Sequence, residues 1–425
     1  MLTKVMSPER RLSLVTPESG PISVCPSRGR VLVVCPAYPS DDNHYRLAFV
    51  HSRTRAYRRF GLSVDVFVVG ETVDLAYREY EGQSVATGNY HALSALLSTG
   101  QYNHVAVHFL TTWPWTALRE FRTTIPMTVW VHGYEAQPWW RRSYDLVGSQ
   151  PTEEDKKVTE ARMAVWKDAL SGDNPALRLV FVSNAFKTEV TEDFETFGIT
   201  VPETLSRVIH NPIDTTVFPY VAKTASARKK VLVVRPFESR KYGTDLAVKA
   251  IMELSGEPEF HEFEFRIVGS GSLFAETTEP LRGFSNVTLQ ETFLSQDEMA
   301  ALFRQYGVFL TPTRCDSQGV SRDEASSCGM VPVTSALAAV QEFCSPAEGF
   351  LAPPEDFTGL ADAMMTMYHD QDLFLRLSAA AAARVRRQTD AEIIIPQEIA
   401  LLSETLQSRL EEYRPSAGIG CEQLG

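Results

Sequence analysis

The sequence predicts an α/β protein made of two Rossmann-like domains, each with a parallel sheet, that face each other across a cleft. The chain has 425 residues, and this length favours two domains of roughly 200 residues over one core. Short β-rich apolar runs alternate with longer helical patterns, as βαβ units require. The alternation occurs twice, before and after a polar linker near residues 217–227.

Composition and charge narrow the class of protein. Hydrophobic residues make up 44% and charged residues 22% of the chain, as in soluble globular proteins, and no apolar run approaches the roughly 20 residues of a membrane span. The net charge of −12 argues against nucleic-acid binding. The N-terminus lacks the apolar core of a secretory signal, so we expect a cytoplasmic protein.

The cysteines show neither C-x-x-C pairs nor zinc-type spacing with histidine. Reduced thiols are therefore expected, without a disulfide frame or a metal site. The six residues are Cys25, Cys35, Cys315, Cys328, Cys344 and Cys421.

The apolar runs set the expected strands and domain limits. Strands are expected in the first half over residues 30–38, 63–70, 104–109, 127–133, 178–184 and 206–212, and in the second half over residues 230–236, 263–270, 287–292, 308–313 and 331–335. The expected order is a flexible tail over 1–27, a first domain over 28–217, a second domain over 228–395, and a C-terminal helix and tail over 396–425.

Two helices have distinct features. Residues 295–306 begin with Ser295 and Glu298 in capping-box spacing and continue with an apolar face, which predicts a helix packed on a sheet. Residues 45–60 form a basic amphipathic pattern. This segment is either an ordinary surface helix with snorkelling arginines or a peripheral contact with anionic lipid headgroups at the inner face of the membrane.

Cations follow the first strand of the second half, and ligands of open α/β sheets bind at strand ends. Arg235 ends this strand, and Arg240 and Lys241 precede the next helix. Arginine and lysine beside a helix N-terminus suit a phosphate group, although solvated loop cations are the alternative. Gly269, in IVGSGS, would allow close backbone approach of a ligand or would simply make a turn.

A polar segment, PTRCDSQGVSRDEASSCGMVPVTS, joins two apolar strands at residues 312–335. The backbone N–H groups of Gly319, Val320 and Ser321 would lie at a helix N-terminus and form an anion site. Glu324 stands in capping-box spacing with Ser321, so it either caps its own helix or faces a ligand. Capping leaves Asp316 unexplained.

With these residues the chain resembles the GT-B glycosyltransferases, particularly the retaining glycosyltransferase family 4. That family has two acidic residues, usually both glutamate, separated by seven residues, with G-x-x after the first and E-A before a later glycine and proline. Asp316, Gly319 and Glu324 occupy these positions here. The segments VLVVRPFESRKYGTDLAVKA and FRIVGSGSL are similar to the family's donor-phosphate segment and its next strand and turn.

The resemblance implies a donor site for a nucleotide-diphosphate sugar. Arg235 and Lys241 would bind the diphosphate and Glu324 the ribose hydroxyls. Asp316 and the backbone from Gly319 to Ser321 would face the sugar and diphosphate, and backbone near residues 291–293 would contact the base. Asp316 is one methylene shorter than the usual glutamate, which would shift either the position of the sugar or the choice of sugar hydroxyl.

The resemblance also implies the reaction. The sugar would pass to a saccharide, lipid-linked or other hydroxyl acceptor with retention at the anomeric carbon, without a metal or other cofactor, and polysaccharide assembly is the preferred context. His132, at the end of MTVWVHGYE, is similar to the family's active-site histidine, although a lone histidine is more often structural. A GT-B epimerase and a silent nucleotide-sugar-binding subunit are the alternatives.

The first half matches the family more loosely. The loop PAYPSDDNHYRLAF lacks the Gly-Gly turn of many members. Tryptophans after two strand ends would contact an acceptor or serve packing; they are Trp113, Trp115, Trp139 and Trp140.

Overall fold

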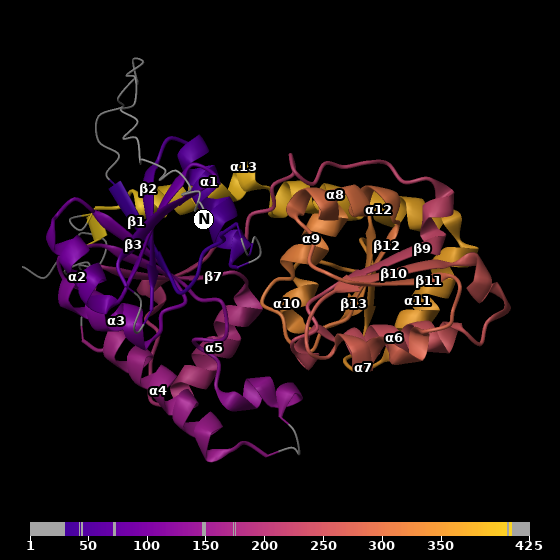
Figure 1. The fold of residues 1–425 in the computed structure, drawn as a ribbon, viewed down its shortest axis with the longest axis horizontal. Coiled ribbons are helices and arrows are strands. Elements are labelled where there is room, and N and C mark those ends of the chain that lie inside the picture. The colour runs from indigo at the N-terminus through magenta and orange to yellow at the C-terminus, as the bar shows by residue number, and fades with distance from the viewer. Residues whose placement is uncertain are drawn as a thin grey trace, which may run out of the picture.

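The computed structural model consists of two α/β lobes, shown in Figure 1 in indigo to magenta and in orange to yellow. It describes residues 30–41, 43, 46–70, 74–146, 150–172, 174, 176–405 and 408–409. The tail expected over residues 1–27 and the end of the C-terminal segment lie outside these residues. Two facing Rossmann-like sheets confirm the predicted fold class.

The first sheet has eight strands in the order β3-β4-β2-β1-β5-β6-β7-β8. The strands are β1 Arg30–Cys35, β2 Ser63–Val69, β3 Ala76–Tyr80, β4 Gln83–Gly88, β5 His104–His108, β6 Met127–Trp130, β7 Leu177–Phe181 and β8 Ser206–Val208. All six predicted strands are present. The hairpin of β3 and β4 was not predicted, because β3 is a half-exposed edge strand and lacks an apolar run.

The second sheet has six parallel strands in the order β11-β10-β9-β12-β13-β14. The strands are β9 Lys230–Val234, β10 Glu264–Gly269, β11 Val287–Glu291, β12 Val308–Thr311, β13 Val331–Ser335 and β14 Phe350–Ala352. The five predicted strands are confirmed. The three residues of β14 are too few to produce a sequence signal.

Helices cover both sheets. They are α1 Ala48–Arg59, α2 Tyr90–Ser98, α3 Thr112–Leu118, α4 Glu153–Ala169, α5 Asn184–Thr196, α6 Thr244–Leu254, α7 Phe274–Thr278, α8 Gln296–Gln305, α9 Val320–Ser327, α10 Ala338–Gln341, α11 Phe357–His369, α12 Gln371–Gln388 and α13 Ala391–Leu402. The capping box of Ser295 and Glu298 is present at α8, as predicted. Among the described helices, none combines the length and the apolar character needed to cross a bilayer.

The C-terminal helix α13 returns to the first domain. Its residues Ile394, Ile395 and Ile399 are buried in the same cluster as Val31 and Val33 of β1, and Figure 1 shows this yellow helix beside α1. The helix begins at Ala391, before the start expected from the sequence. Because α13 packs on the first domain, the chain crosses between the lobes twice. Both crossings lie on one side of the cleft, where Ile213 pairs with Asp390.

Candidate functional site

A cleft of about 590 Å³ lies between the carboxyl ends of the two sheets. Residues from both domains line it, because parallel strands of each sheet end at the edge that faces the other domain. The structure brings all of the predicted site residues to this cleft: His132, Arg235, Lys241, Gly269, Asp316, Gly319, Val320, Ser321 and Glu324.

Arg235 is the best-anchored cation of the cleft. It follows β9, is 8% exposed, and its Nη1 donates a hydrogen bond of 3.2 Å to Oγ of Ser321. Its Nε has no partner in the described part of the chain. Burial lowers the pKa of the guanidinium and the nearby Asp316 opposes this shift, but arginine remains charged.

Lys241 and Arg240 have different surroundings. Lys241 lines the cleft with its Nζ 5.4 Å from the centre of the Tyr242 ring. Arg240 lines a separate surface pocket, and its backbone N–H donates to Asp145 of the first domain. Lys241 therefore lies where a phosphate contact in the cleft was predicted, whereas Arg240 does not line the cleft.

Gly269 has a packing reason to be glycine. A Cβ atom there would lie 1.9 Å from the carbonyl oxygen of Arg235, a distance that no side chain can accept. The close approach of β9 and β10 at this point holds the end of β9, and with it Arg235, against the cleft. Gly269 therefore shapes the site whether or not a ligand touches it.

The polar segment after β12 forms a loop and a helix start, as predicted. Gly319 is the N-cap of α9 with φ 94° and ψ 58°, in the left-handed region. The backbone N–H groups of Gly319, Val320 and Ser321 have no partner among the described residues. Helix N-termini favour anions, so these groups and Arg235 together form an anion site.

Glu324 does not cap its helix, and this alternative is wrong. The N-cap is Gly319, which lacks a side chain, and Ser321 lies within α9. Glu324 lines the cleft at 9% exposure. Burial, aided by the neighbouring Asp323, raises the pKa of its carboxyl group to about 8.

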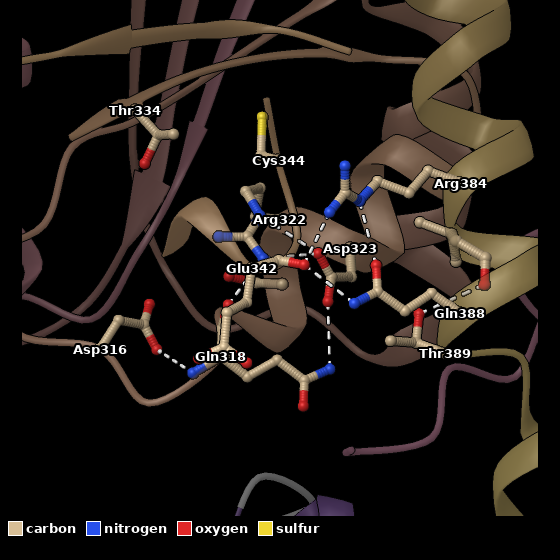
Figure 2. A network of polar contacts seen from close by, with 12 residues as sticks. Asp316, Gln318, Arg322, Asp323, Thr334, Glu342, Cys344, Arg384, Gln388 and Thr389 are labelled. Carbon is tan, nitrogen blue, oxygen red and sulfur yellow. Dashed lines mark hydrogen bonds and ion pairs between the residues drawn. The ribbon is translucent and has the colours of Figure 1, made fainter. Parts of the chain in front are cut away.

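A buried polar network connects the loop to the start of α9 (Figure 2). Gln318 donates through Nε2 to Oδ2 of Asp323 at 3.1 Å, and Oδ1 of Asp323 accepts from Nη2 of Arg322 at 2.7 Å. Asp316 accepts from the backbone N–H of Gln318 at 3.2 Å. The network fixes the conformation of the loop that presents Asp316 to the cleft.

Gln318 also joins the two domains. Its Oε1 accepts from the backbone N–H of Asn211 at 2.6 Å, and its Nε2 donates to the carbonyl of Asn211 at 3.1 Å. Gln318, Arg322 and Asp323 were not among the predicted site residues. The signal was available: three strongly polar residues stand in a helix start between two buried strands.

His132 forms the first-domain wall. It follows β6, and the Glu135 carboxylate accepts hydrogen bonds from the backbone N–H groups of His132 at 2.6 Å and Gly133 at 3.1 Å. Burial lowers the pKa of the His132 ring well below its ordinary value and raises the pKa of Glu135 to about 7. The imidazole of His132 is therefore neutral near pH 7.

The tryptophans lie outside the cleft wall. Trp115 is buried and donates to Asp168 at 2.7 Å, and Trp113 stacks on Tyr90. Trp140 stacks on Phe197 and donates to Asp193, while the backbone N–H of Trp139 donates to Thr159. Trp113 and Trp115 therefore serve packing, whereas Trp140 is 36% exposed and an acceptor contact of Trp139 or Trp140 stays a prediction.

Much of the basic face of α1 is paired within the protein. Arg53 is 1% exposed and bonds Glu398 of α13 at 3.1 Å, and Arg59 bonds Glu392 at 2.5 Å. Helix α1 therefore packs against α13, and a membrane contact of this helix stays a prediction.

Among the described residues, Cys35, Cys315, Cys328 and Cys344 are free thiols, and Cys25 and Cys421 lie outside these residues. Within the described ranges, no group of three or more histidine, cysteine or acidic side chains is arranged to hold a metal ion.

The structure is that of a two-domain α/β protein whose cleft is lined by Arg235, Lys241 and the N-terminus of α9. Residues 228–370, about a third of the chain, match the family model described as glycosyl transferases group 1. The match covers the domain that contributes Arg235, Lys241 and Glu324. No curated protein sequence matches the chain.

Solved structures extend the similarity to both domains. A sucrose-phosphate synthase from Thermosynechococcus elongatus aligns with a TM-score of 0.66 at 18% identity, over 88% of this chain and 98% of that one. The UDP-forming trehalose-phosphate synthase of Burkholderia vietnamiensis aligns with a TM-score of 0.65 at 14% identity, over 90% and 98%. Anabaena HepE, solved with UDP and glucose, aligns with a TM-score of 0.62 at 13% identity, over 88% and 99%. These similarities show the GT-B fold.

Proposed function

We propose that the protein is a retaining glycosyltransferase of family 4 that moves a sugar, such as a hexose, from a nucleotide-diphosphate sugar to an acceptor hydroxyl. The observation that carries the proposal is the anion site of Arg235 and the α9 N-terminus, which lies in the same cleft as the buried carboxyl of Glu324. The family match of residues 228–370 supports the transferase class. The sugar and nucleotide in the Anabaena HepE structure support the donor class.

The second domain would bind the donor. Arg235, Lys241 and the N–H groups of Gly319 to Ser321 would surround the diphosphate, and Glu324 would accept hydrogen bonds from the ribose hydroxyls. Three kinds of hydrogen-bond donor, a guanidinium, an ammonium and backbone N–H groups, would then contact the diphosphate leaving group without having to reorganise. Preorganised donors of this kind each contribute about 3 kcal/mol to transition-state stabilisation.

The chemical step exchanges one bond at the anomeric carbon. The bond from this carbon to the diphosphate oxygen breaks with its electron pair on the oxygen, and a bond to the acceptor oxygen forms on the same face. The acceptor proton goes to the departing phosphate oxygen. The protein residues stabilise the charge on this oxygen, and no step requires a cofactor.

Asp316 and His132 would orient the sugar from opposite domains. Asp316 is an acceptor of hydrogen bonds and lies on the loop held by Gln318, whereas His132 is a neutral ring on the first-domain wall. Neither group needs to form a covalent bond with the sugar. The acceptor, a saccharide, a lipid-linked sugar or another alcohol, would enter along the first domain, in polysaccharide or glycoconjugate assembly at the cytoplasmic side.

Two alternative functions make different predictions. A GT-B epimerase would convert the donor without an acceptor, and a silent subunit would bind the donor without releasing its nucleoside diphosphate. Incubation with donor alone, followed by a search for an epimer, distinguishes the epimerase.

The proposal is tested first by donor binding. A panel of nucleotide sugars beginning with UDP-glucose is scored by thermal shift, because a ligand that binds only the folded state at 100 times its Kd stabilises it by about 2.7 kcal/mol. We expect one nucleotide class to raise the melting temperature. If none does, at concentrations up to several millimolar, the proposed function is wrong.

A further inference from the structure

A second histidine, His108, lies directly behind His132. It ends β5, next to β6 in the sheet, and its side chain is fully buried. Nδ1 of His108 and Nε2 of His132 are 2.9 Å apart, a hydrogen bond between the two rings. The His108 ring also stacks on Trp130 with a centroid separation of 5.0 Å. Within the part of the chain that the structure describes, the side chain of His108 therefore has one hydrogen-bond partner, His132.

The direction of this hydrogen bond follows from the unpaired nitrogen of His108. Nε2 of His108 is buried and has no partner among the described residues. If His132 donated, the proton of neutral His108 would sit on this Nε2 as a buried N–H without an acceptor, which is rare and costs about 1–3 kcal/mol. An unpaired acceptor nitrogen is the more tolerable arrangement. Nδ1–H of His108 is therefore the donor and Nε2 of His132 the acceptor.

The same arrangement decides which nitrogen of His132 carries its proton. Because Nε2 accepts, the proton of the neutral ring is on Nδ1. Within the described ranges Nδ1 has no partner, and it belongs to a residue that lines the cleft. The rings of Phe49 and Phe109, with centroids 4.9 and 4.5 Å from that of His132, hold the imidazole in place.

Burial and the neighbouring cation Arg53 keep both rings neutral. Burial lowers the pKa of His108 and of His132 well below the ordinary value, and the buried guanidinium of Arg53 lowers both further. The guanidinium of Arg53 is itself paired with Glu398, whose carboxylate also accepts from Nε1 of Trp130 at 3.3 Å. Neither ring becomes an imidazolium near pH 7, so His132 does not serve as a charged acid.

We propose that His108 is a positioning residue that holds His132 in the Nδ1–H tautomer, so that His132 donates a hydrogen bond to an oxygen of the bound nucleotide sugar. The donated bond rests on the proposed function, whereas the tautomer does not. A proton on Nδ1 also means that this nitrogen cannot take up the proton of the hydroxyl group to which the sugar is transferred. His132 thus favours a ligand oxygen that accepts a hydrogen bond. His108 determines this preference from outside the cleft, because it fixes the tautomer of His132.

The tautomer is measured on the ligand-free full chain. Nitrogen-15 labelling of the histidines, with the His132 signals assigned by their loss in His132→Gln, gives the protonation of each ring nitrogen. We expect His132 to carry its proton on Nδ1 and to keep this state from pH 6 to 8. A proton on Nε2 of His132, or an imidazolium in this range, overturns the proposal whatever the protein binds.

Variants of His108 provide the second readout. His108→Asn keeps an N–H donor near the place of Nδ1, whereas His108→Leu removes it. His104→Leu is the matched control, because His104 is equally buried on the same strand and bonds Thr128 instead.

We expect His108→Leu to weaken UDP-glucose, or the best donor of the panel, about tenfold, and to leave UDP binding unchanged. His108→Asn should retain most of the donor affinity, and His104→Leu should change neither ligand. Equal loss of UDP and UDP-glucose in His108→Leu contradicts a sugar contact through His132. If the native protein binds no nucleotide sugar of the panel and no nucleoside diphosphate, the proposed function is wrong, and the tautomer is decided by the nitrogen-15 measurement alone.

Discussion

The affinity for a nucleotide sugar should rise with pH because of Glu324. The carboxyl group lines the cleft at 9% exposure, and its pKa is raised to about 8 by burial and by Asp323. Ribose hydroxyls donate hydrogen bonds, so they bind the carboxylate better than the neutral acid. The ligand must therefore bind with release of a proton wherever the empty site holds Glu324 protonated.

The magnitude follows from the fraction of carboxylate. With a pKa of about 8, the group is about 3% ionised at pH 6.5 and about 76% ionised at pH 8.5, a ratio of about 25. If only the carboxylate binds, the Kd falls by about 25-fold across this interval, which corresponds to about 1.9 kcal/mol. Binding to the neutral acid would reduce this factor.

The assay is titration calorimetry with UDP-glucose, or the best donor of the panel, at pH 6.5, 7.5 and 8.5. Glu135 also has a raised pKa, about 7, so the native profile is compared with that of Glu324→Gln. We expect the variant to lose most of the slope, as should a donor analogue that lacks the ribose hydroxyls. An equal slope in native protein and Glu324→Gln would refute the assignment of Glu324 to the ribose.

Three further predictions concern residues that line the cleft or support it. Lys241→Ala should reduce the rate of sugar transfer about a hundredfold or more while the protein remains folded. Lys249→Ala, on the exposed part of α6, should leave this rate unchanged. Near-native transfer by Lys241→Ala would show that Lys241 does not belong to the donor site. Gly269→Ala should lower the free energy of unfolding in urea by about 3 kcal/mol, because its Cβ meets the Arg235 carbonyl, and an unchanged midpoint would contradict this. Gln318→Leu should lower the free energy of unfolding by about 3 kcal/mol, because it leaves the buried partners of Gln318 unpaired. Gln341→Leu, at an exposed position, should lower it by less than about 0.5 kcal/mol. Equal losses in the two variants would show that the network does not join the domains.

Stability should also respond to the raised carboxyl pKa. Glu324 binds its proton more tightly in the folded than in the unfolded protein, because its ordinary pKa is near 4.5. Stability from this group is therefore present at low pH and is lost as pH rises from about 4.5 to about 8. The melting temperature of the ligand-free native protein should fall more over this interval than that of Glu324→Gln.

Much of the site could be predicted because it depends on local sequence. Arg235, Lys241 and the residues from Gly319 to Glu324 directly follow apolar strands, and the ends of parallel strands meet at one edge of a sheet. Their order along the chain therefore places them together without knowledge of side-chain contacts. The edge elements β3 and β14 could not be predicted, since one is polar and the other is three residues long.

Contacts between distant segments required the tertiary structure. Sequence spacing allowed Glu324 either to cap α9 or to face the cleft, and the choice depends on Gly319 being the N-cap. The roles of Gln318 and His108 arise from partners more than twenty residues away, Asn211 and His132. A spacing pattern cannot reveal such a partner.

The sequence by itself determined the two parallel sheets, the cleft between them and the cations at the ends of their strands. Periodicity and strand order are local properties of the chain, and parallel topology converts them into position. Only the tertiary structure decided the burial that raises the pKa of Glu324, the contact between His132 and His108, and the return of α13 to the first domain. These depend on burial and on hydrogen-bond partners brought from remote segments, since a pKa and a tautomer are properties of the surroundings and not of the residue alone.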